Sequence, residues 1–430
     1  MPGAVPTMPG VRAPPEYAER LRQDVARLLR RHSTSFPGSQ PVSFLKQHIP
    51  QNLEKEDYFV CEKSDGIRCL MYLTRHGEDE ATYLIDRKND FYYVANLHFP
   101  LLDDMQKFHV DCLVDGELVL DDDGPLDPVD STTTEDTGEA HAERKLVMRF
   151  LVFDSLVIDG KLLTERTLDK RLGYFRELVY KPYSHLCKTY PEEVSYFPFL
   201  VDFKDMEFSY ALPKLWTEIV PKLKHGCDGL IFTSRSEPYI FGTDDKILKW
   251  KPADENSIDF KLFLHFPTYT DPTPPPNEEA TYTDYDVQPI TTLSIWTGDK
   301  NYKHYGDLYL TAEEWEKLRN LNEPLDERIV ECVLDTELNA WRFLRFRDDK
   351  PNANHVTIAN NVVLSVKDSV SKEDLLASAN KIREAWKRRT AVQQQQEHEA
   401  RRARERERER RVSSQPQQDG AVTGDKRKAV

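Results

Sequence analysis

The sequence contains few cysteines, and none of them is arranged for a common metal site. Six cysteines occur in 430 residues, and no two of them form a CxxC pair. This excludes the usual zinc spacings, and the wide separations are typical of reduced intracellular thiols rather than of a disulfide framework. The positions are Cys61, Cys69, Cys112, Cys187, Cys227 and Cys332.

Long apolar runs are also lacking. The first fifteen residues, MPGAVPTMPGVRAPP, contain no apolar core of a signal peptide, and no later run approaches the length of a membrane helix. The chain shows no internal repeat. We therefore expect an intracellular, soluble protein without a membrane partner, folded into two or three domains.

The chain has fewer basic residues than acidic residues. The chain has 59 Lys and Arg against 74 Asp and Glu, a formal net charge of -15. A protein with this balance is not a general binder of polyanions. Any nucleotide or nucleic acid must therefore bind in a local basic cleft.

The first part of the chain predicts an α+β domain over residues 15–252. After a Pro/Gly-rich stretch at 1–14 that we expect to be disordered, apolar residues at helical spacing predict a helix from about 15 to 31. A polar, acidic stretch at 121–145 is interpreted as a disordered insertion without chemistry. The pattern also predicts a helix near 165–179 and an antiparallel sheet with strands at 57–63, 67–74, 82–85, 91–94, 109–120, 146–155, 199–203, 228–234 and 245–252.

The composition changes after Pro252, and a second domain is predicted over residues 253–388. Short strands with one interposed helix at 311–319 are typical of a small Greek-key barrel of the OB type. The predicted strands are 258–266, 291–297, 305–310, 328–334 and 340–347, and a helix at 371–388 follows them. The remaining residues, 389–430, are of low complexity and contain the run RRARERERERR, so we expect a disordered charged tail or, at most, a solvated single helix.

Six short stretches place charged residues inside otherwise apolar sequence, which is costly unless those residues line a site. Each stretch alone has an ordinary structural explanation, such as an ion pair, a half-exposed edge strand or a core aromatic. Lys63 itself is compatible with a strand-edge lysine paired with Glu62 or Asp65, or with a nucleophile that attacks a phosphate. The stretches are KSDGIR (63–68), DGE (115–117), FD (153–154), CDGLIF (227–232), LKWK (248–251) and WRFLRFRDDKPN (341–352).

In this order and spacing, the six stretches resemble the covalent nucleotidyltransferases, the superfamily of mRNA capping guanylyltransferases and polynucleotide ligases. The similarity covers residues 15–388 apart from the acidic insertion, and it is close to the fungal guanylyltransferases, the alpha subunits of the capping enzyme. FPGSQPVSF (36–44) and WRFLRFRDDKPN are typical of the capping branch. The resemblance implies a nucleotidyltransferase domain with an ATP-grasp-like antiparallel sheet, followed by an OB-fold barrel domain.

The resemblance also implies a reaction in two steps. A lysine attacks the α-phosphate of GTP and releases pyrophosphate, and the resulting lysyl-GMP then passes GMP to the 5′-diphosphate end of RNA, which forms the GpppN cap. By this match Lys63 is the nucleophile. Because an ordinary lysine is less than ~0.1% neutral at pH 7, we expect burial and nearby cations (Lys249, Lys251 and a metal) to favour its neutral form.

The same match assigns the residues that bind GTP and the metal. In the first domain it implies Arg68 on the ribose or a phosphate, Arg87 on the triphosphate, Glu117 on the ribose hydroxyls or a metal-bound water, Phe153 stacked on the purine, Lys204 at the guanine O6, and Lys249 and Lys251 on the α-phosphate. Asp228, together with Glu117, would hold Mg²⁺ or Mn²⁺. Asp65 is interpreted as the structural partner of Lys63, and Gly66 as the point where backbone approaches the nucleotide.

The second domain is expected to complete the triphosphate site. The resemblance implies that Arg345, Arg347, Asp349 and Lys350 orient the β- and γ-phosphates so that pyrophosphate leaves in line with the attacking nitrogen. Because these residues and Lys63 lie on different domains, we predict a cleft that closes over GTP for the first step and opens for the second.

Two other functions fit parts of the pattern. An ATP-dependent polynucleotide ligase shares the lysine motif and the OB domain, although the chain shows no DNA-encircling domain. A catalytically dead module that binds RNA ends is the third possibility, and adduct formation with labelled GTP or ATP would separate the three.

The chain has no HCxxxxxR stretch and no second acidic-strand domain of an RNA triphosphatase. The resemblance therefore implies a separate RNA 5′-triphosphatase, the beta subunit, as a partner. It further implies binding to the phosphorylated C-terminal domain of RNA polymerase II and a nuclear location.

Overall fold

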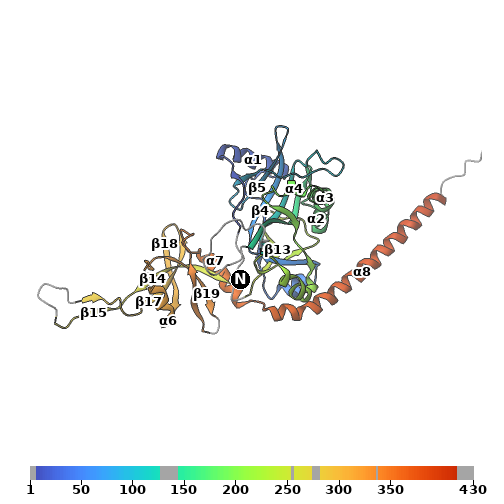
Figure 1. The fold of residues 1–430 in the computed structure, drawn as a ribbon. Coiled ribbons are helices and arrows are strands. Elements are labelled where there is room, and N and C mark those ends of the chain that lie inside the picture. The colour runs from blue at the N-terminus through green and yellow to red at the C-terminus, as the bar shows by residue number, and fades with distance from the viewer. Residues whose placement is uncertain (1–5, 126–143, 253–255, 274–280, 336–337, 414–430) are drawn as a thin grey trace, which may run out of the picture.

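The computed structural model describes residues 6–125, 144–252, 256–273, 281–335 and 338–413. Two bodies lie side by side, a mixed α/β domain and a smaller β-barrel, and a long C-terminal helix projects from the first of them (Figure 1). None of the described helices is long and apolar enough to cross a membrane.

The first domain contains two sheets, and the larger one has eight strands. The order is β1-β6-β5-β4-β7-β8-β10, with β9 paired to β8, and of the described pairs in this sheet only β8 with β10 is parallel. The strands are β1 (Val11–Arg12), β4 (Ile67–His76), β5 (Asp79–Ile85), β6 (Phe91–Val94), β7 (Cys112–Pro125), β8 (Arg144–Ile158), β9 (Lys161–Leu162) and β10 (Leu200–Phe203).

Both faces of this sheet are covered, which explains why its central strands read as continuous apolar runs. Successive side chains of a strand point to opposite faces. On β4, Met71 and Leu73 therefore join one core cluster, whereas Leu70 and Tyr72 join another. The first cluster includes residues of α3 (Lys181–Thr189), and the second includes residues of α1 (Pro15–Leu28).

The smaller sheet has the order β11-β3-β12-β13-β2, with β2 parallel to β13. One face packs on the start of α8, where Leu375, Ala379 and Ile382 enter the core. The indole Nε1 of Trp250 also donates to the carbonyl of Val370 at 2.7 Å. The strands are β2 (Ser39–Ser43), β3 (Tyr58–Ser64), β11 (Glu207–Phe208), β12 (Cys227–Ser234) and β13 (Gly242–Trp250), and α8 is Lys372–Ser413.

The second domain is a closed five-stranded barrel with the order β14-β17-β18-β20-β19, which confirms the predicted barrel. Helix α6 begins with a capping box between Thr311 and Glu314. The elements are β14 (Ser257–His265), β17 (Ile290–Gly298), β18 (Asn301–Tyr309), α6 (Ala312–Arg319), β19 (Ile329–Asp335), β20 (Ala340–Phe346), α7 (Val356–Lys367) and a hairpin of β15 (Thr268–Thr270) and β16 (Thr281–Thr283). In the first domain, helical segments are also found at α2 (Leu168–Phe175), Arg176–Tyr180, α4 (Pro191–Val194), Ile49–Leu53, Ser209–Ala211, α5 (Leu212–Lys214), Leu215–Ile219 and Val220–Lys222.

The structure differs from the sequence prediction at several boundaries. Residues 6–14 are not disordered, because β1 pairs with β6 through Val11 and Tyr93. The acidic stretch 121–145 begins and ends as extensions of β7 and β8, and its residues 126–143 lie outside the described residues. The predicted C-terminal helix of the barrel packs on the first domain instead, because its apolar face completes the smaller sheet.

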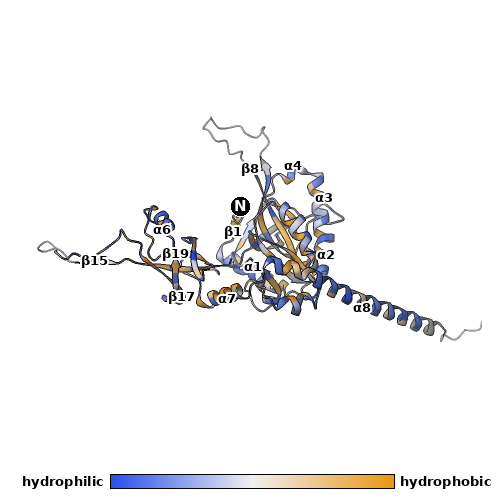
Figure 2. Cartoon of the chain, turned by 90° about the horizontal axis from the view of Figure 1, so that it is seen from below, coloured by the Kyte–Doolittle hydropathy of each residue, from blue (hydrophilic) through white to orange (hydrophobic). Residues whose placement is uncertain are grey.

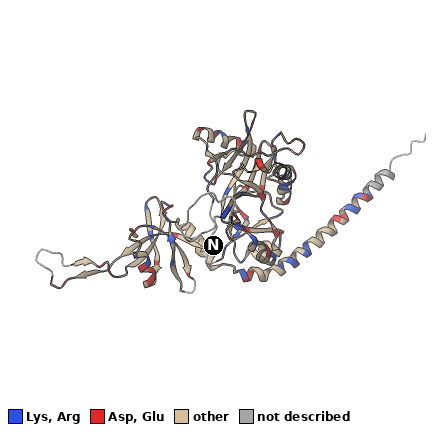
Figure 3. Ribbon diagram, in the orientation of Figure 1, with Lys and Arg blue, Asp and Glu red and all other residues tan. Residues whose placement is uncertain are grey.

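The expected charged tail continues α8 as a helix to Ser413, and residues 414–430 lie outside the described part of the chain. Figure 2 shows that the projecting end of α8 is hydrophilic, and Figure 3 shows basic and acidic residues interspersed along it. Pairs such as Gln393 with Glu397 and Arg401 with Glu405 follow the four-residue spacing that supports a solvated helix.

Candidate active site

The two sheets of the first domain enclose a cavity of about 510 Å³, a usual size for a ligand site. Strands of both sheets contribute to its wall. It brings together residues from the first four charged stretches and from LKWK, apart from Asp228 and Lys251. The sequence-predicted residues that line it are Lys63, Asp65, Gly66, Arg68, Arg87, Glu117, Phe153, Lys204 and Lys249.

Lys63 is paired with Asp228, and the predicted partnership with Asp65 is wrong. Lys63 Nζ lies 2.7 Å from Asp228 Oδ1, and Lys251 Nζ lies 2.5 Å from Oδ2 of the same carboxylate. The cause is the antiparallel pairing of β3 with β12, which sets Ser64 opposite Cys227 and so brings their neighbours together. Burial opposes ionisation of Asp228, but the bonds from Lys251 and Lys63 outweigh it and lower the pKa of Asp228.

Lys63 lies where two cavities adjoin. The second cavity, of about 320 Å³, is lined by Lys63, Lys249 and Lys251 and extends to Ser257 and Val362 of the barrel domain. Burial lowers the pKa of Lys249, and the nearby charges of Lys251 and Lys63 lower it further. Three lysines around one point form the local basic cleft that an acidic protein needs for a phosphate.

Arg68 is held by a buried carboxylate that has no assigned role in the sequence prediction. Its Nε and Nη2 donate to the two oxygens of Asp115 at 3.1 and 2.7 Å, and Nη1 donates to the carbonyl of Ser39. Asp115 also accepts a bond from the Tyr239 hydroxyl at 2.5 Å. The Arg68 guanidinium lies 5.4 Å from the centre of the Phe153 ring, so a cation and an aromatic ring lie together at the cavity wall.

Gly66 allows two strands of the larger sheet to pack closely, whether or not a nucleotide approaches it. A Cβ atom at this position would lie 2.2 Å from the backbone carbonyl of Leu118 on β7. Backbone atoms cannot yield as a flexible side chain can, so any larger residue must push β4 and β7 apart. This contact accounts for the glycine without reference to a ligand.

Lys204 is deeply buried at the cavity wall, with a side chain 3% exposed. Its Nζ donates to Ser64 Oγ at 2.8 Å and to Glu117 Oε2 at 3.2 Å, and Glu62 Oε1 lies 3.7 Å away. Burial would lower the pKa of Lys204, but the carboxylates of Glu117 and Glu62 outweigh it and raise the pKa. Lys204 is therefore a fixed ammonium that can only donate hydrogen bonds.

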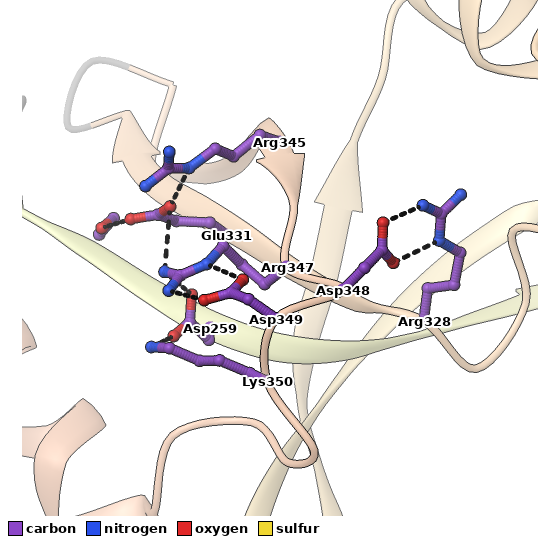
Figure 4. A network of polar contacts seen from close by, with 9 residues as sticks. Asp259, Arg328, Glu331, Arg345, Arg347, Asp348, Asp349 and Lys350 are labelled. Carbon is purple, nitrogen blue, oxygen red and sulfur yellow. Dashed lines mark hydrogen bonds and ion pairs between the residues drawn. The ribbon is translucent and has the colours of Figure 1, made fainter. Parts of the chain in front are cut away.

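The second-domain cluster lines neither cavity around Lys63 in the described residues. Its cations are paired with carboxylates of the barrel (Figure 4): Arg345 with Glu331 at 2.6 Å, Arg347 with Asp349 at 2.9 Å, and Lys350 with Asp259. Asp259 and Glu331 are nearly buried and lie opposite each other on β14 and β19. In this structure these cations therefore face acids of their own domain.

The sequence matches two family models that together cover most of the chain. The model for the mRNA capping enzyme catalytic domain matches residues 5–253, and the model for its C-terminal domain matches residues 255–376. The chain belongs to the mRNA capping enzyme family. Because both matches are to capping enzymes, the ligase alternative falls away, and the chain is a nucleotidyltransferase of the mRNA guanylyltransferase type.

Curated relatives agree with this assignment to the capping enzyme family. The mRNA-capping enzyme subunit alpha of Yarrowia lipolytica is 46% identical over 394 residues, which cover 90% of this chain and 93% of the relative. The protein of the same name from Schizosaccharomyces pombe is 45% identical, with 88% and 89% covered. Among solved structures, the ATP-dependent DNA ligase of bacteriophage T7 with ATP overlaps 72% of this chain and 98% of its own at 16% identity and a TM-score of 0.32.

The capping enzyme site also contains residues that sequence reasoning missed. Asp154 forms a buried two-point ion pair with Arg171 at 2.7 and 2.8 Å, directly after Phe153. Asp121, placed by the sequence prediction in an insertion without chemistry, is buried and bonded to His225 at 2.7 Å. For Asp154 the only signal is a charge within an apolar strand. Asp121 begins an acidic run and gives no such signal, and its partner His225 lies on a distant segment.

The residues of this capping enzyme fit a divalent cation only in part. Asp228 and Glu117 offer the carboxylate oxygens that Mg²⁺ and Mn²⁺ prefer. However, neither residue belongs to a group of three or more potential ligands among the described residues. A metal here would be held by one or two carboxylates, and the nucleotide phosphates would complete its coordination, which is a usual arrangement for Mg²⁺.

Proposed function

We propose that Lys63 is the residue that becomes guanylylated, and that GMP then passes to the 5′-diphosphate end of RNA. The observation that supports this is the position of Lys63 at the junction of two cavities, beside Lys249 and Lys251. In the first step Nζ forms a bond to the α-phosphorus of GTP, the bond to the bridging oxygen breaks, and pyrophosphate leaves. In the second step a terminal oxygen of the RNA diphosphate attacks the same phosphorus and displaces Lys63.

The ion pair between Lys63 and Asp228 bears on the first step. Lys63 can attack only with a free lone pair, whereas a contact with the Asp228 carboxylate favours the ammonium form. Asp228 must therefore release Lys63 when the nucleotide binds, while it keeps Lys251 or takes up a divalent cation. A metal held there would neutralise charge on the phosphates, and Mg²⁺ and Mn²⁺ are the candidates.

The remaining first-domain residues would hold the nucleotide. Asp115 and the Ser39 carbonyl occupy three of the five N–H groups of Arg68. Because the residue lines the cavity, its other N–H groups can reach the ribose or a phosphate. Phe153 offers a ring to the purine. Glu117, on release from Lys204, can accept bonds from the ribose hydroxyls, and Arg87, bonded to Gln40 at 2.9 Å, lies at the cavity for the triphosphate.

Closure of the two domains would bring the second-domain cations to the β- and γ-phosphates. In this structure Arg345, Arg347 and Lys350 are neutralised by acids of the barrel. A triphosphate can replace these acids because it offers several charged acceptors at once. The cations would then return to their own carboxylates when pyrophosphate leaves, and the cleft would open for RNA.

Labelling with GTP tests the covalent step. We expect wild type to form an acid-stable adduct with α-³²P-GTP but not with ATP, and peptide mapping to find the label on Lys63. Lys63→Ala and Lys63→Arg should form none, whereas Lys145→Ala, at an exposed lysine of β8, should label as wild type does. Label on another lysine, or an adduct that persists in Lys63→Arg, would contradict the assignment.

Variants of the second-domain cations should affect the two catalytic steps differently. Arg345→Ala and Lys350→Ala should slow adduct formation at least about tenfold, because they remove charge that positions the leaving pyrophosphate. Transfer from isolated enzyme-GMP to 5′-diphosphate RNA should change little. Arg328→Ala is the control, since Arg328 is paired with Asp348 on the same barrel at 2.7 Å. Wild-type adduct formation in both variants would rule out closure.

The partners follow from the same proposal. The curated relatives are named alpha subunits, so a beta subunit with RNA 5′-triphosphatase activity is the partner we propose. We further propose that the protein acts in the nucleus and binds the phosphorylated C-terminal domain of RNA polymerase II. Co-purification of tagged protein with a triphosphatase and with phosphorylated, but not unphosphorylated, polymerase would test both partnerships.

A further inference from the structure

Behind the wall of the larger cavity lies a buried polar network that the two-step reaction does not use. It joins four segments that are far apart in sequence: β3, β7, the residue directly after β10 and the loop before β12. Ser64 and Lys204 line the cavity, whereas the other members stand behind them. The members are Glu62, Ser64, Asp121, Lys204 and His225, and their side chains are at most about one tenth exposed.

The hydrogen bonds of Ser64 fix the proton positions on His225. Three groups surround Ser64 Oγ: Lys204 Nζ at 2.8 Å, His225 Nε2 at 3.1 Å and Glu62 Oε1 at 3.3 Å. A hydroxyl donates one bond and accepts two. Because the ammonium only donates and the carboxylate only accepts, Ser64 donates to Glu62 and His225 Nε2 must donate to Ser64.

The other ring nitrogen of His225 carries a proton as well. Its Nδ1 lies 2.7 Å from Asp121 Oδ1, which only accepts. His225 is therefore an imidazolium held between Asp121 on one side and Ser64 and Glu62 on the other. Burial opposes this charge, but the bonds to Asp121 and Glu62 outweigh it and raise the pKa of His225 to about 9.

This arrangement determines how Lys204 faces the cavity. An ammonium has three N–H groups, and the acceptors around Lys204 are Ser64, Glu62 and Glu117. Ser64 and Glu62 are held from behind by His225, whereas Glu117 belongs to the cavity wall. If Glu117 turns to the ribose, as the proposed function has it, one N–H of Lys204 faces the base while the other two keep their partners.

We propose that His225, backed by Asp121, is a positioning residue for base selection, because it holds Ser64 and Glu62 so that Lys204 presents an N–H to a purine keto oxygen. A fixed donor can donate to the O6 of guanine, whereas it would face the amino group of adenine donor to donor. The inference rests on the proposed function, in which a purine nucleotide fills the cavity. His225 and Asp121 would thus influence which base Lys204 selects, although they themselves touch no nucleotide.

Nucleotides with and without the keto oxygen separate this role from a merely structural one. Adduct formation is measured with GTP and with inosine triphosphate, which keeps O6. The triphosphates of 2-aminopurine riboside and adenosine, which lack O6, are titrated as competitors of GTP labelling to obtain their inhibition constants. For His225→Gln we expect KM for the two keto nucleotides to rise about tenfold with little change in the saturated rate, since hydrogen bonds to charged groups are of this strength. The two nucleotides without O6 should be unaffected.

A matched histidine serves as the control. His109 is also buried and bonded to an aspartate, with Nδ1 2.8 Å from Asp159, but it does not line the cavity or join the network. His109→Gln should leave all four nucleotides unchanged. Asp121→Asn provides a second route if His225→Gln does not fold, and it should shift the keto nucleotides in the same direction.

The outcomes decide between the possibilities. A loss shared equally by all four nucleotides, or an unchanged preference for GTP over ATP in both variants, would overturn the inference and leave the network a structural one. Failure of the wild-type protein to form any adduct would instead overturn the proposed function. These results are distinguishable because the first is a comparison among nucleotides and the second is an absence of labelling.

Discussion

Replacing Arg171 by methionine would leave the buried carboxylate of Asp154 without its cation. The two side chains are only 2% and 6% exposed, so water cannot take the place of the guanidinium. Removal of one partner from such a pair costs about 3–5 kcal/mol. We expect this loss in the free energy of unfolding at pH 7.5, from urea titrations followed by tryptophan fluorescence. The double variant Asp154→Leu with Arg171→Met should recover most of it, because both charges are then gone.

The pH dependence of this loss has a definite sign. Burial raises the pKa of Asp154 even in the presence of Arg171, and loss of the cation raises it further. A carboxyl with a raised folded-state pKa stabilises the fold below its unfolded pKa of about 3.9, and this contribution is lost as pH rises through the folded value. The deficit of Arg171→Met should therefore shrink between pH 7.5 and pH 5.

A partly exposed pair provides the comparison. Arg235 is 39% exposed and lies 3.0 Å from Asp169, so Arg235→Met should cost less than about 1 kcal/mol. If Arg171→Met cost no more than Arg235→Met, or if its deficit did not change with pH, the reasoning from burial would be refuted.

Two further substitutions probe the site. Asp228→Asn should slow adduct formation by about 10²-fold in single-turnover labelling, because the carboxylate organises Lys63 and Lys251; faster labelling would show instead that the carboxylate only restrains the nucleophile. Gly66→Ala should cost about 1–3 kcal/mol in urea unfolding, since its Cβ would meet the backbone of Leu118. Gly173→Ala, where the space is open, should be neutral or stabilising, and equal effects of the two alanines would contradict the packing argument.

The sequence predicted most elements because their patterns are local. Period-two and continuous apolar runs identify strands such as β4, whose residues are buried on both faces. The partner of Lys63 could not be found in this way, because Asp228 is distant in sequence and the contact depends on the register of β3 with β12. The role of His225 could not be predicted for the same reason. A single histidine gives no signal in the sequence until the fold places Asp121 and Ser64 beside it.

The C-terminal helix shows a second limit. Leu375, Ala379 and Ile382 recur at helical spacing, which predicts the helix but not the surface that it covers. Its apolar face could equally pack on the barrel that precedes it. In the structure it joins the core of the smaller sheet and packs on Ser209–Ala211 and α5, where the ring centres of Trp386 and Tyr210 lie 4.9 Å apart.

The hydrogen bond between Trp250 and Val370 has a mechanical consequence. The chain leaves the first domain just after Trp250 and returns to it at Val370, so the barrel is fastened at both of its ends to a single point. Two neighbouring chain connections allow the barrel to rotate about one axis and restrict its other rotations. The cations of the barrel therefore remain at a high effective concentration near the cleft. In the proposed closure, the barrel would pass from one catalytic step to the other by a change of angle, without a search through solution.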